Sequence, residues 1–435
     1  RQETASEVEA TVKRLLAQPV SAFFVSVGLI LATAYAVSHF PRSIVAFMLF
    51  QASILILYFA RMPAWVKGTL AAATLGVLMP LLGSINGYYL EIAIQVGIFV
   101  ALALGLNIVV GLAGLLDLGY VPFFAVGAYT WAVFGSPQAN LFLPGGHFPL
   151  AQGWFFLFLL VGVGMAAGAG ILLGLPVLRL HGDYLAIVTL GFGEVIRVLA
   201  NNLDKPINFT NGPKGITPIS RPPIFFDPLL RAVGITSDPN VIYPLYLYFI
   251  VLAIVGVTVL VNRRLEDSHI GRAWEAIRED QTAAQAMGVP LVRSKLLAFA
   301  CGASFAGTVG VLFSAKQVFI NPESFTFMES IGVLAMVILG GMGSIPGAIL
   351  GATVVTVLNL QVLKGLSLWL NELRNAGTTI FGWSLQNLPT QLEPAKYERM
   401  VFGLILVLMM IFRPQGILPA RRRHRELTGG AGEPH

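Results

Sequence analysis

Long runs of apolar residues follow one another along most of the chain, and they restrict its fold more than any other feature. A helix of roughly 20 apolar residues crosses the hydrocarbon core of a bilayer. Hydrophobic residues make up 56% of the 435 residues and charged residues only 11%, which leaves too little polar surface to cover a water-soluble fold. We therefore predict an all-α fold, a polytopic bundle of transmembrane helices.

Polar breaks divide these runs into about 12 membrane segments, and the expected range is roughly 10–12. The segments are 20–37, 44–60, 68–85, 90–110, 120–134, 153–177, 184–200, 243–262, 296–315, 326–341, 344–363 and 399–412. The segments 120–134 and 326–341 are short and rich in glycine. Each of these two either crosses the membrane or forms a broken or re-entrant helix.

The positive charge of the chain is spread along it. The net charge is +6, and the Lys and Arg residues stand at the ends of apolar runs without clustering near aromatic residues. This distribution is typical of residues that orient spans in a lipid bilayer, and it argues against nucleic-acid binding.

No pattern of residues points to catalysis. The single cysteine, Cys301, excludes intrachain disulfides and a cysteine metal site, and the six histidines fall in loops or tails. No Gly-x-x-x-x-Gly-Lys-Ser/Thr phosphate loop is present, so the chain should not hydrolyse ATP. We expect a protein that is not an enzyme, with no catalytic residue, metal ligand or cofactor of its own.

One charged segment, residues 271–288, interrupts the apolar sequence. Apolar Ala273, Ile277, Ala284 and Met287 recur at helical spacing among charged residues, which predicts a single amphipathic helix about four turns long. Gly288 can adopt the left-handed conformation that ends a helix, and the proline two residues later cannot continue it. A second helix should then enter the membrane.

Ionisable residues inside a span are costly and face the protein interior or a water path. Glu194 and Arg197 are three residues apart, so they share a helix face and can neutralise each other. Gly191 and Gly193 permit a close approach to the backbone. Together with Asn107 they are candidates for a translocation path. The alternatives are a structural ion pair for Glu194 and Arg197, and a hydrogen bond between helices for Asn107.

Two short segments resemble each other. Residues 108–114, IVVGLAG, and residues 337–343, VILGGMG, each close an apolar run that another glycine-rich run follows. Transporters built from two related halves place their substrate path where such helices meet. Chance similarity between apolar segments is the alternative.

The chain divides into three regions. Residues 1–88 form an N-terminal extension with about three spans, and its first twenty residues form either a surface helix or a solvated tail. Residues 89–420 form the core, and residues 421–435 form a basic tail that should be disordered. The charged loop 263–295 is expected in the cytoplasm, and alternation of the spans then places both termini there.

Six stretches in the same order resemble one family. They are 105–129 (GLNIVVGLAGLLDLGYVPFFAVGAY), 175–197 (LPVLRLHGDYLAIVTLGFGEVIR), 271–299, 321–327 (NPESFTF), 337–347 (VILGGMGSIPG) and 413–419 (RPQGILP). Together they resemble the permease of high-affinity branched-chain amino acid ABC importers. The helices before residue 88 resemble the N-terminal extension of one subunit type of such importers.

The loop carries a further resemblance to the permeases of ABC importers. Their cytoplasmic loop has Glu-Ala-Ala, three residues and then Gly, and this chain has Thr282, Ala283, Ala284, three residues and then Gly288. The resemblance implies a helix that docks in a cleft of the ATPase subunit. The residues implied in this coupling are Glu275, Ala276, Arg278, Glu279, Ala283, Ala284 and Gly288.

The resemblance further implies a bacterial inner-membrane subunit that moves leucine, isoleucine or valine into the cytoplasm by alternating access. Its partners would be a second, related permease, two cytoplasmic ATPase subunits that bind ATP and Mg²⁺, and a periplasmic binding protein. Two alternatives stay open. A urea or short-amide importer permease has similar motifs, and an ion-coupled secondary carrier would need several buried acids or histidines for coupling.

Overall fold

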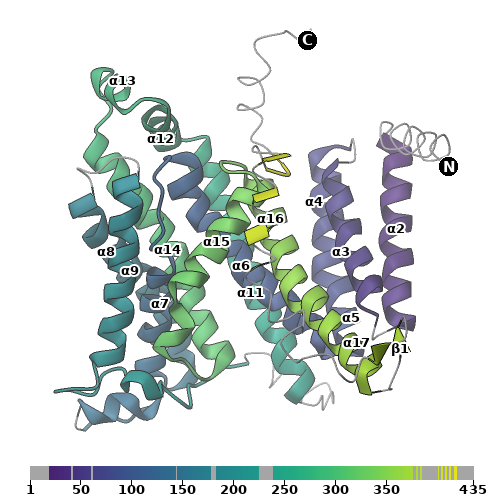
Figure 1. The fold of residues 1–435 in the computed structure, drawn as a ribbon, viewed down its shortest axis with the longest axis horizontal. Coiled ribbons are helices and arrows are strands. Elements are labelled where there is room, and N and C mark those ends of the chain that lie inside the picture. The colour runs from purple at the N-terminus through teal and green to yellow at the C-terminus, as the bar shows by residue number, and fades with distance from the viewer. Residues whose placement is uncertain are drawn as a thin grey trace. The chain divides into compact units, whose positions relative to one another are not determined.

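The computed structural model describes residues 19–40, 43–59, 62–143, 145–177, 183–224, 239–375, 379–380, 383–384, 400, 403–404, 407–408, 411–412 and 416–418. Almost all of the regular structure in these residues is helical (Figure 1). The prediction of an all-α bundle is confirmed. The only strands in the described part are β1 (Thr379–Ile380) and β2 (Trp383–Ser384), which pair antiparallel with Thr379 opposite Ser384.

The helices follow one another in a simple order. The α-helices are α2 (Pro19–His39), α3 (Ile44–Phe59), α4 (Ala64–Ala73), α5 (Met79–Ile85), α6 (Gly87–Leu106), α7 (Val121–Phe134), α8 (Phe155–Val177), α9 (Asp183–Asn202), α11 (Pro239–Glu266), α12 (His269–Glu279), α13 (Gln281–Ala286), α14 (Leu291–Gln317), α15 (Phe327–Gly340), α16 (Ile345–Val357) and α17 (Lys364–Asn375). Three π-helices, η1 (Thr74–Leu78), η2 (Asn107–Leu112) and η7 (Leu358–Leu363), continue α-helices without a loop. Short 3₁₀ turns are η3 (Pro137–Leu141), η4 (Gln152–Trp154), η5 (Gly212–Lys214) and η6 (Pro322–Phe325).

Nine helical segments of the described residues are long and apolar enough to cross a membrane. They are Ser21–His39, Trp65–Ile85, Gly87–Leu112, Gln152–Pro176, Tyr184–Asn202, Ile242–Glu266, Leu291–Gln317, Pro322–Gly340 and Ile345–Leu363, and each overlaps a predicted segment. Two more predicted segments contain shorter apolar helices, Val45–Ile54 and Val121–Phe134. Half of the twelfth, 399–412, lies outside the described residues, so the count of 12 stays a prediction.

The segment 120–134 forms a short helix. With 14 residues, α7 is about 21 Å long at roughly 1.5 Å per residue, less than the ~30 Å of a bilayer core. The segment before it, 113–120, is irregular. The preceding span therefore ends in η2 and an irregular turn before α7 begins, and both alternatives for the segment 120–134 stay predictions.

The described residues group into two compact units that do not follow the predicted division at residue 88. One unit takes residues from 1–95, 236–249 and 357–398, and the other takes residues from 96–235, 250–356 and 399–435. The predicted regions are continuous stretches of sequence, whereas each of the two units joins three separate stretches. The first twenty residues and the tail 421–435 lie almost entirely outside the described part.

Aromatic side chains hold the first unit together. The rings of Phe47 and Tyr89 stack with their centroids 4.3 Å apart. The Tyr248 hydroxyl donates a hydrogen bond of 2.7 Å to the carbonyl of Leu75, which lies in the π-helix η1. A π-helix leaves carbonyl groups with weak local partners, so a side chain that reaches one stabilises the irregular turn.

Small residues hold the second unit together. Helix α14 lies against α7 and α8, and a Cβ added to Gly307 of α14 would lie 2.5 Å from the carbonyl oxygen of Gly162 in α8. A Cβ on Gly310 would meet the backbone of α7 at Phe124. Glycine at these crossings lets the backbones approach closely, which is how helices associate where lipid removes the hydrophobic driving force.

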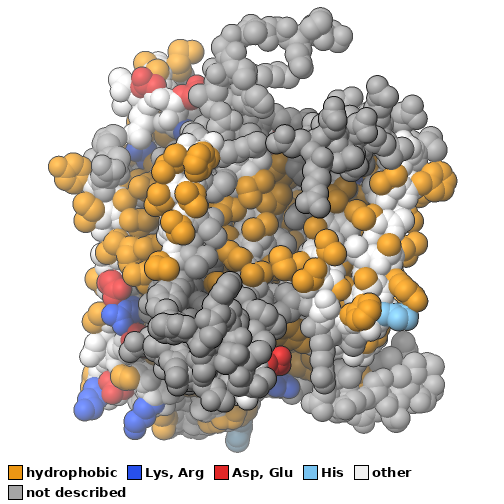
Figure 2. Space-filling view, turned by 45° about the vertical axis from the view of Figure 1, so that its right-hand side comes forward, with side chains coloured by type: hydrophobic (Ala, Val, Ile, Leu, Met, Phe, Trp, Pro, Cys, Tyr) orange, Lys and Arg blue, Asp and Glu red, His pale blue; other side chains and the backbone are white. Residues whose placement is uncertain are grey.

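The outer surface is largely apolar. Figure 2 shows hydrophobic side chains over most of the described surface in that view, with Lys, Arg, Asp and Glu in small groups. Exposed Leu160 of α8, Ile187 of α9 and Leu260 of α11 are each more than 60% accessible. Such a surface fits a lipid environment and not water.

Candidate functional site

The charged segment 271–288 forms two helices and not the single helix predicted from its periodicity. Helix α12 ends at Glu279, and the next residue, Asp280, has an extended backbone at φ −152° and ψ 113°. The Asp280 carboxylate accepts hydrogen bonds from the N–H groups of Thr282 at 2.7 Å and Ala283 at 3.0 Å. These bonds hold the pKa of the Asp280 carboxyl below its usual value. The prediction was wrong because a short acidic side chain can cap a new helix in place of continuing the old one.

Buried side chains fasten this helix pair to the start of α14. Trp274 is fully buried, and its Nε1–H donates a hydrogen bond of 2.7 Å to the carbonyl of Ser294. Lys295 is buried, and its Nζ donates to the side-chain oxygen of Gln281 at 2.9 Å. Neither contact follows from helical periodicity. For the contact of Trp274 with Ser294, the one available signal in the sequence was a tryptophan within so charged a segment.

The predicted apolar face is correct in part. Ile277 and Ala284 are buried, and Ala273 is half-buried. Met287, however, is 85% exposed because α13 ends at Ala286 and the methionine caps it. The predicted stop is confirmed: Gly288 has φ +86°, and α14 begins directly after the following proline.

Two glycine-rich segments far apart in the sequence meet close to the helix pair α12–α13. Asn107, the first residue of η2, is buried, and its Oδ1 accepts a hydrogen bond of 2.8 Å from the N–H of Gly343 in the turn between α15 and α16. A Cβ added to Gly111 would lie 2.5 Å from the same nitrogen. The two segments noted for their similarity, 108–114 and 337–343, therefore lie in contact. Asn107 thus joins η2 to a turn between two helices, whereas the prediction was a bond between helices.

Arg278 of α12 reaches this contact. Its Nη1 donates a hydrogen bond to the carbonyl of Gly111. Its Cγ would lie 2.7 Å from a Cβ at Gly114, and its Nη1 3.0 Å from a Cβ at Gly343. Glycine at these positions leaves room for the arginine. We call Asn107, Gly111, Gly114, Arg278 and Gly343 the glycine junction.

The other predicted coupling residues lie around Arg278 on the helix pair. Glu275 and Ala276 are half-buried, Ala284 is buried, and Glu279, Ala283 and Gly288 are exposed. The pair thus has an inner side that contacts the bundle and an outer side that the second unit leaves uncovered.

A short segment of the C-terminal region contacts the end of α15. There the N–H groups of Ile417 and Leu418 donate to the carbonyls of Leu339 and Gly340, each at 2.9 Å.

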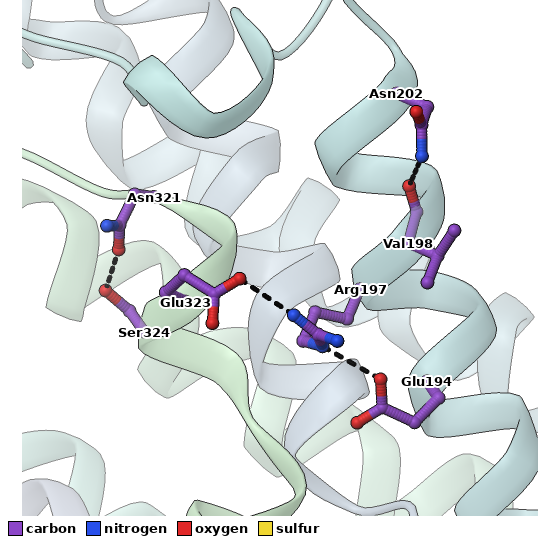
Figure 3. Close-up of polar contacts among 7 residues, drawn as sticks. All are labelled: Glu194, Arg197, Val198, Asn202, Asn321, Glu323 and Ser324. Carbon is purple, nitrogen blue, oxygen red and sulfur yellow. Dashed lines mark hydrogen bonds and ion pairs between the residues drawn. The ribbon is translucent and has the colours of Figure 1, made fainter.

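A second polar group lies on α9. The Nε of Arg197 donates to Glu194 at 2.8 Å, which confirms the predicted pair, and its Nη1 donates to Glu323 of η6 at 2.7 Å (Figure 3). The side chains are partly exposed, at 26% for Arg197, 38% for Glu194 and 58% for Glu323. Spacing within one helix gives no signal for Glu323, which stands in the motif 321–327. We call these three residues the Arg197 triad.

The two candidate glycines of α9 differ in their surroundings. A Cβ on Gly193 would lie 3.2 Å from Pro122 and 3.5 Å from Gly119, so this glycine permits contact with the start of α7. A Cβ on Gly191 would meet none of the described residues within 4 Å. Of the two glycines, the structure therefore gives a packing role only to Gly193.

The predicted path residues do not form one cluster. Asn107 bonds to the turn that follows α15, whereas Arg197 bonds to η6, which precedes α15. The glycine junction and the Arg197 triad thus lie at opposite ends of α15.

A narrow pocket adjoins the triad. It is lined by Pro122, Ala125, Tyr129, Gly193, Ile196, Arg197, Ala200, Pro322 and Phe325. Among the described residues, no group of three or more His, Cys, Asp or Glu side chains could hold a metal ion.

Comparison with known proteins gives a consistent picture. Residues 88–410 match the model of a family described as branched-chain amino acid transport system / permease component. The chain is 39% identical over 355 residues to the high-affinity branched-chain amino acid transport system permease protein LivM of Escherichia coli K12, covering 79% of this chain and 73% of that protein. It is 40% identical over 352 residues to LivM of Salmonella typhimurium, covering 78% and 72%.

A shorter similarity joins the chain to a differently named permease. It is 35% identical over 106 residues to the permease protein LivH of Salmonella typhimurium, covering 24% of this chain and 33% of that protein. No solved structure is significantly similar to the chain.

Proposed function

Because this chain belongs to the family of branched-chain amino acid transport system permease components, we propose that it is the membrane-spanning subunit of an ATP-driven importer that moves leucine, isoleucine and valine into the cytoplasm. The long similarity to two LivM proteins supports this substrate class. It also disfavours the urea or short-amide alternative. Membership of the family makes the chain a transport subunit and not a carrier that works alone.

The observation that carries the coupling proposal is the position of Arg278. One side chain of a charged helix pair contacts the backbone of two glycine-rich segments that belong to different spans. Trp274 fastens the same helix to the start of α14. A push on α12 would therefore move α14 and the glycine junction together, because packed elements shift as units and do not deform continuously. We assign to α12 and α13 the role of the element that receives this push.

The outer side of the helix pair is the part that an ATPase subunit would contact. Glu279, Ala283 and Gly288 are exposed there. The positive φ of Gly288 fixes the turn from α13 into α14. ATP and Mg²⁺ would bind to the partner subunits, and closure of two such subunits would drive the change from outward to inward access.

The partners follow from the same proposal. A second, related permease would complete the path, and the similarity to LivH is in keeping with a pair of related subunits. Two ATPase subunits would lie on the cytoplasmic side, and a periplasmic binding protein would deliver the amino acid. We place the chain in a bacterial inner membrane, with α12, α13 and both termini in the cytoplasm.

Co-purification from native membranes tests the proposal. A tag on this chain should recover a second permease and two ATPase subunits, and a leucine-loaded binding protein should stimulate ATP hydrolysis by the complex. The unloaded binding protein is the control. If the chain purifies alone and accumulates solute on an ion gradient, the importer proposal is wrong and the secondary carrier replaces it.

A further inference from the structure

The Arg197 triad and the pocket beside it lie at the end of the bundle away from the glycine junction. Helix α14 has 27 residues, about 40 Å at roughly 1.5 Å per residue, which is enough to cross a bilayer. The helix pair α12–α13 precedes it, and η6 with Glu323 follows it. The triad is therefore on the side where a binding protein would deliver substrate, if α12 and α13 are cytoplasmic.

The pocket itself combines one cation with an apolar wall. Of the described residues that line it, Arg197 alone is charged, and the others come from α7, α9 and η6. Ala125, Ile196 and Phe325 supply an apolar surface, but the free volume between them is only about 10 Å³, so a side chain can enter only when η6 moves away from α9. Tyr129 also lines the pocket, and its hydroxyl is buried without a hydrogen-bond partner in the described part of the chain. A buried polar group of this kind is costly unless a ligand or water satisfies it.

The charges of the triad complement a particular class of ligand. A guanidinium binds a carboxylate through a planar fork, and a carboxylate binds an ammonium group. Glu194, three residues before Arg197 on the same helix, orients the guanidinium through Nε and leaves Nη1 to Glu323 of a different element. The bond between Nη1 and Glu323 is thus the one that can open without disturbing α9.

We propose that a zwitterionic α-amino acid with a short apolar side chain binds here by inserting into the Arg197–Glu323 ion pair. Its carboxylate takes the place of Glu323 on Arg197, its ammonium group binds Glu323, and its side chain enters the apolar pocket. Every charge stays paired during the exchange, because the ligand carries one charge of each sign. This avoids the cost of leaving an arginine or a carboxylate unpaired near lipid.

The direct bond between Arg197 and Glu323 holds η6 against α9, so insertion of the amino acid would separate η6 from α9 and widen the pocket. The inference rests on the proposed function, since it assigns to this chain the site that first receives the amino acid. It adds the residues that contact the substrate.

Photo-crosslinking with a diazirine analogue of leucine tests the site in the intact complex. We expect the analogue to label peptides that contain residues 193–200 or Pro322–Phe325, and excess leucine to suppress this labelling. Arg197→Gln and Glu323→Gln should each reduce the displaceable labelling about tenfold or more, because each removes a charge-assisted hydrogen bond. Lys214→Gln is the matched control, since Lys214 is an exposed cation next to the strand bridge of Ile216 with Ile320 on the same side.

Competition on the unaltered complex needs no variant. Leucine should displace the analogue, whereas leucinamide, which lacks the carboxylate, and N-acetyl-leucine, which lacks the ammonium group, should each fail. Displacement by either one would overturn insertion between Arg197 and Glu323. Labelling that leucine does not suppress, or that lies elsewhere in the chain, would overturn the site.

A different measurement tests the proposed function independently of the substrate site. ATP-driven uptake of leucine by the same complex in proteoliposomes, with its binding protein, reports on that function alone. Uptake without displaceable labelling in the pocket refutes the site and leaves the importer intact. Absence of uptake of all three branched-chain amino acids refutes the importer.

Discussion

Arg278 shows how a charged residue outside the bilayer acts on a span. The end of a helix leaves carbonyl groups without intrahelical partners, and a π-helix leaves them poorly aligned. Gly111 lies near the end of η2, and Arg278 donates to its carbonyl. The guanidinium therefore stabilises the place where the span that contains α6 and η2 ends, and it does so from the helix to which we assign the coupling role.

Replacement of Arg278 by alanine should uncouple ATP hydrolysis from substrate. We expect leucine-loaded binding protein to stimulate hydrolysis at least about fivefold less than in the unaltered complex, since a hydrogen bond from a charged donor contributes about 1.5–3 kcal/mol. Basal hydrolysis and recovery of the complex should be unchanged. Arg272→Ala is the matched control because Arg272 is exposed on the same helix. Equal stimulation in Arg278→Ala and Arg272→Ala would contradict the role of Arg278.

Gly111 gives a second prediction at the same scale. Its Cβ would contact Asn107 Oδ1 and would lie 2.5 Å from the nitrogen of Gly343. Alanine there should destabilise the bundle by about 1–3 kcal/mol, the usual effect of overpacking. The melting temperature of the purified complex in detergent should fall. Gly164→Ala of α8 is the control, since a Cβ there would contact no atom of the described part of the chain within 4 Å. An equal change in the two variants would argue against a tight contact at Gly111.

At the scale of elements, the break at Asp280 determines the direction of the helix pair. A continuous helix from 271 to 288 would keep one axis, whereas the extended backbone of Asp280 lets α13 start in a new direction. Ala284 is buried on α13 while Met287 is exposed. The cap therefore decides which residues of the pair contact the bundle and which are left for a partner.

The cap can be tested by hydrogen exchange. In Asp280→Ala, the amides of Thr282 and Ala283 should exchange faster because they lose their acceptor. Asp280→Asn should retain most of the protection, since asparagine also caps helices. Unchanged exchange in the alanine variant would show that the side chain does not cap α13.

The same cap has a defined pH dependence. The pKa of the Asp280 carboxyl is lower in the folded protein than its usual value, so its contribution is present above the usual aspartate value of about 3.9 and is lost as pH falls through the lowered one. Protection of the Thr282 and Ala283 amides should thus be constant from about pH 8 to pH 5 and should decline only below about pH 4. A decline near neutral pH would contradict the assignment.

At the scale of the whole molecule, the membrane gives the chain its two sides. The charged pair α12–α13 and the η6 turn lie at opposite ends of α14. The isolated bridge between Ile216 and Ile320 brings the segment after α9 to the η6 end. The candidate coupling residues and the candidate substrate residues thus occupy opposite ends of one helix, as a transporter driven from the cytoplasm requires.

Labelling of introduced cysteines tests this arrangement. Cys301 is the single cysteine of the chain, so Cys301→Ala provides a background without thiols. In that background, Gln285→Cys should react with a membrane-impermeant maleimide only in inside-out vesicles, and Lys214→Cys only in intact spheroplasts. Both side chains are exposed in the structure. Labelling of both cysteines from the same side would contradict the proposed orientation.

Features that depend on neighbouring residues could be predicted from the sequence. The spans follow from runs of apolar residues, the Glu194–Arg197 pair follows from a spacing of three, and the turn at Gly288 follows from a glycine before a proline. These are local effects, because a bilayer or a single helix imposes them on any chain with that pattern. The family resemblance of the same motifs was confirmed as well.

Features that join distant residues were decided by the tertiary structure. Glu323 lies 126 positions from Arg197, and Gly343 lies 236 positions from Asn107. The spacing of a sequence holds no information about such pairs, because their contact depends on how α7, α9, α14 and α15 pack. Even the break at Asp280, which is local, could not be predicted, because the regular pattern of residues around it is that of a continuous helix. The sequence alone determined that the chain is a multi-pass membrane protein, whereas packing determined which polar groups meet at the two ends of α15.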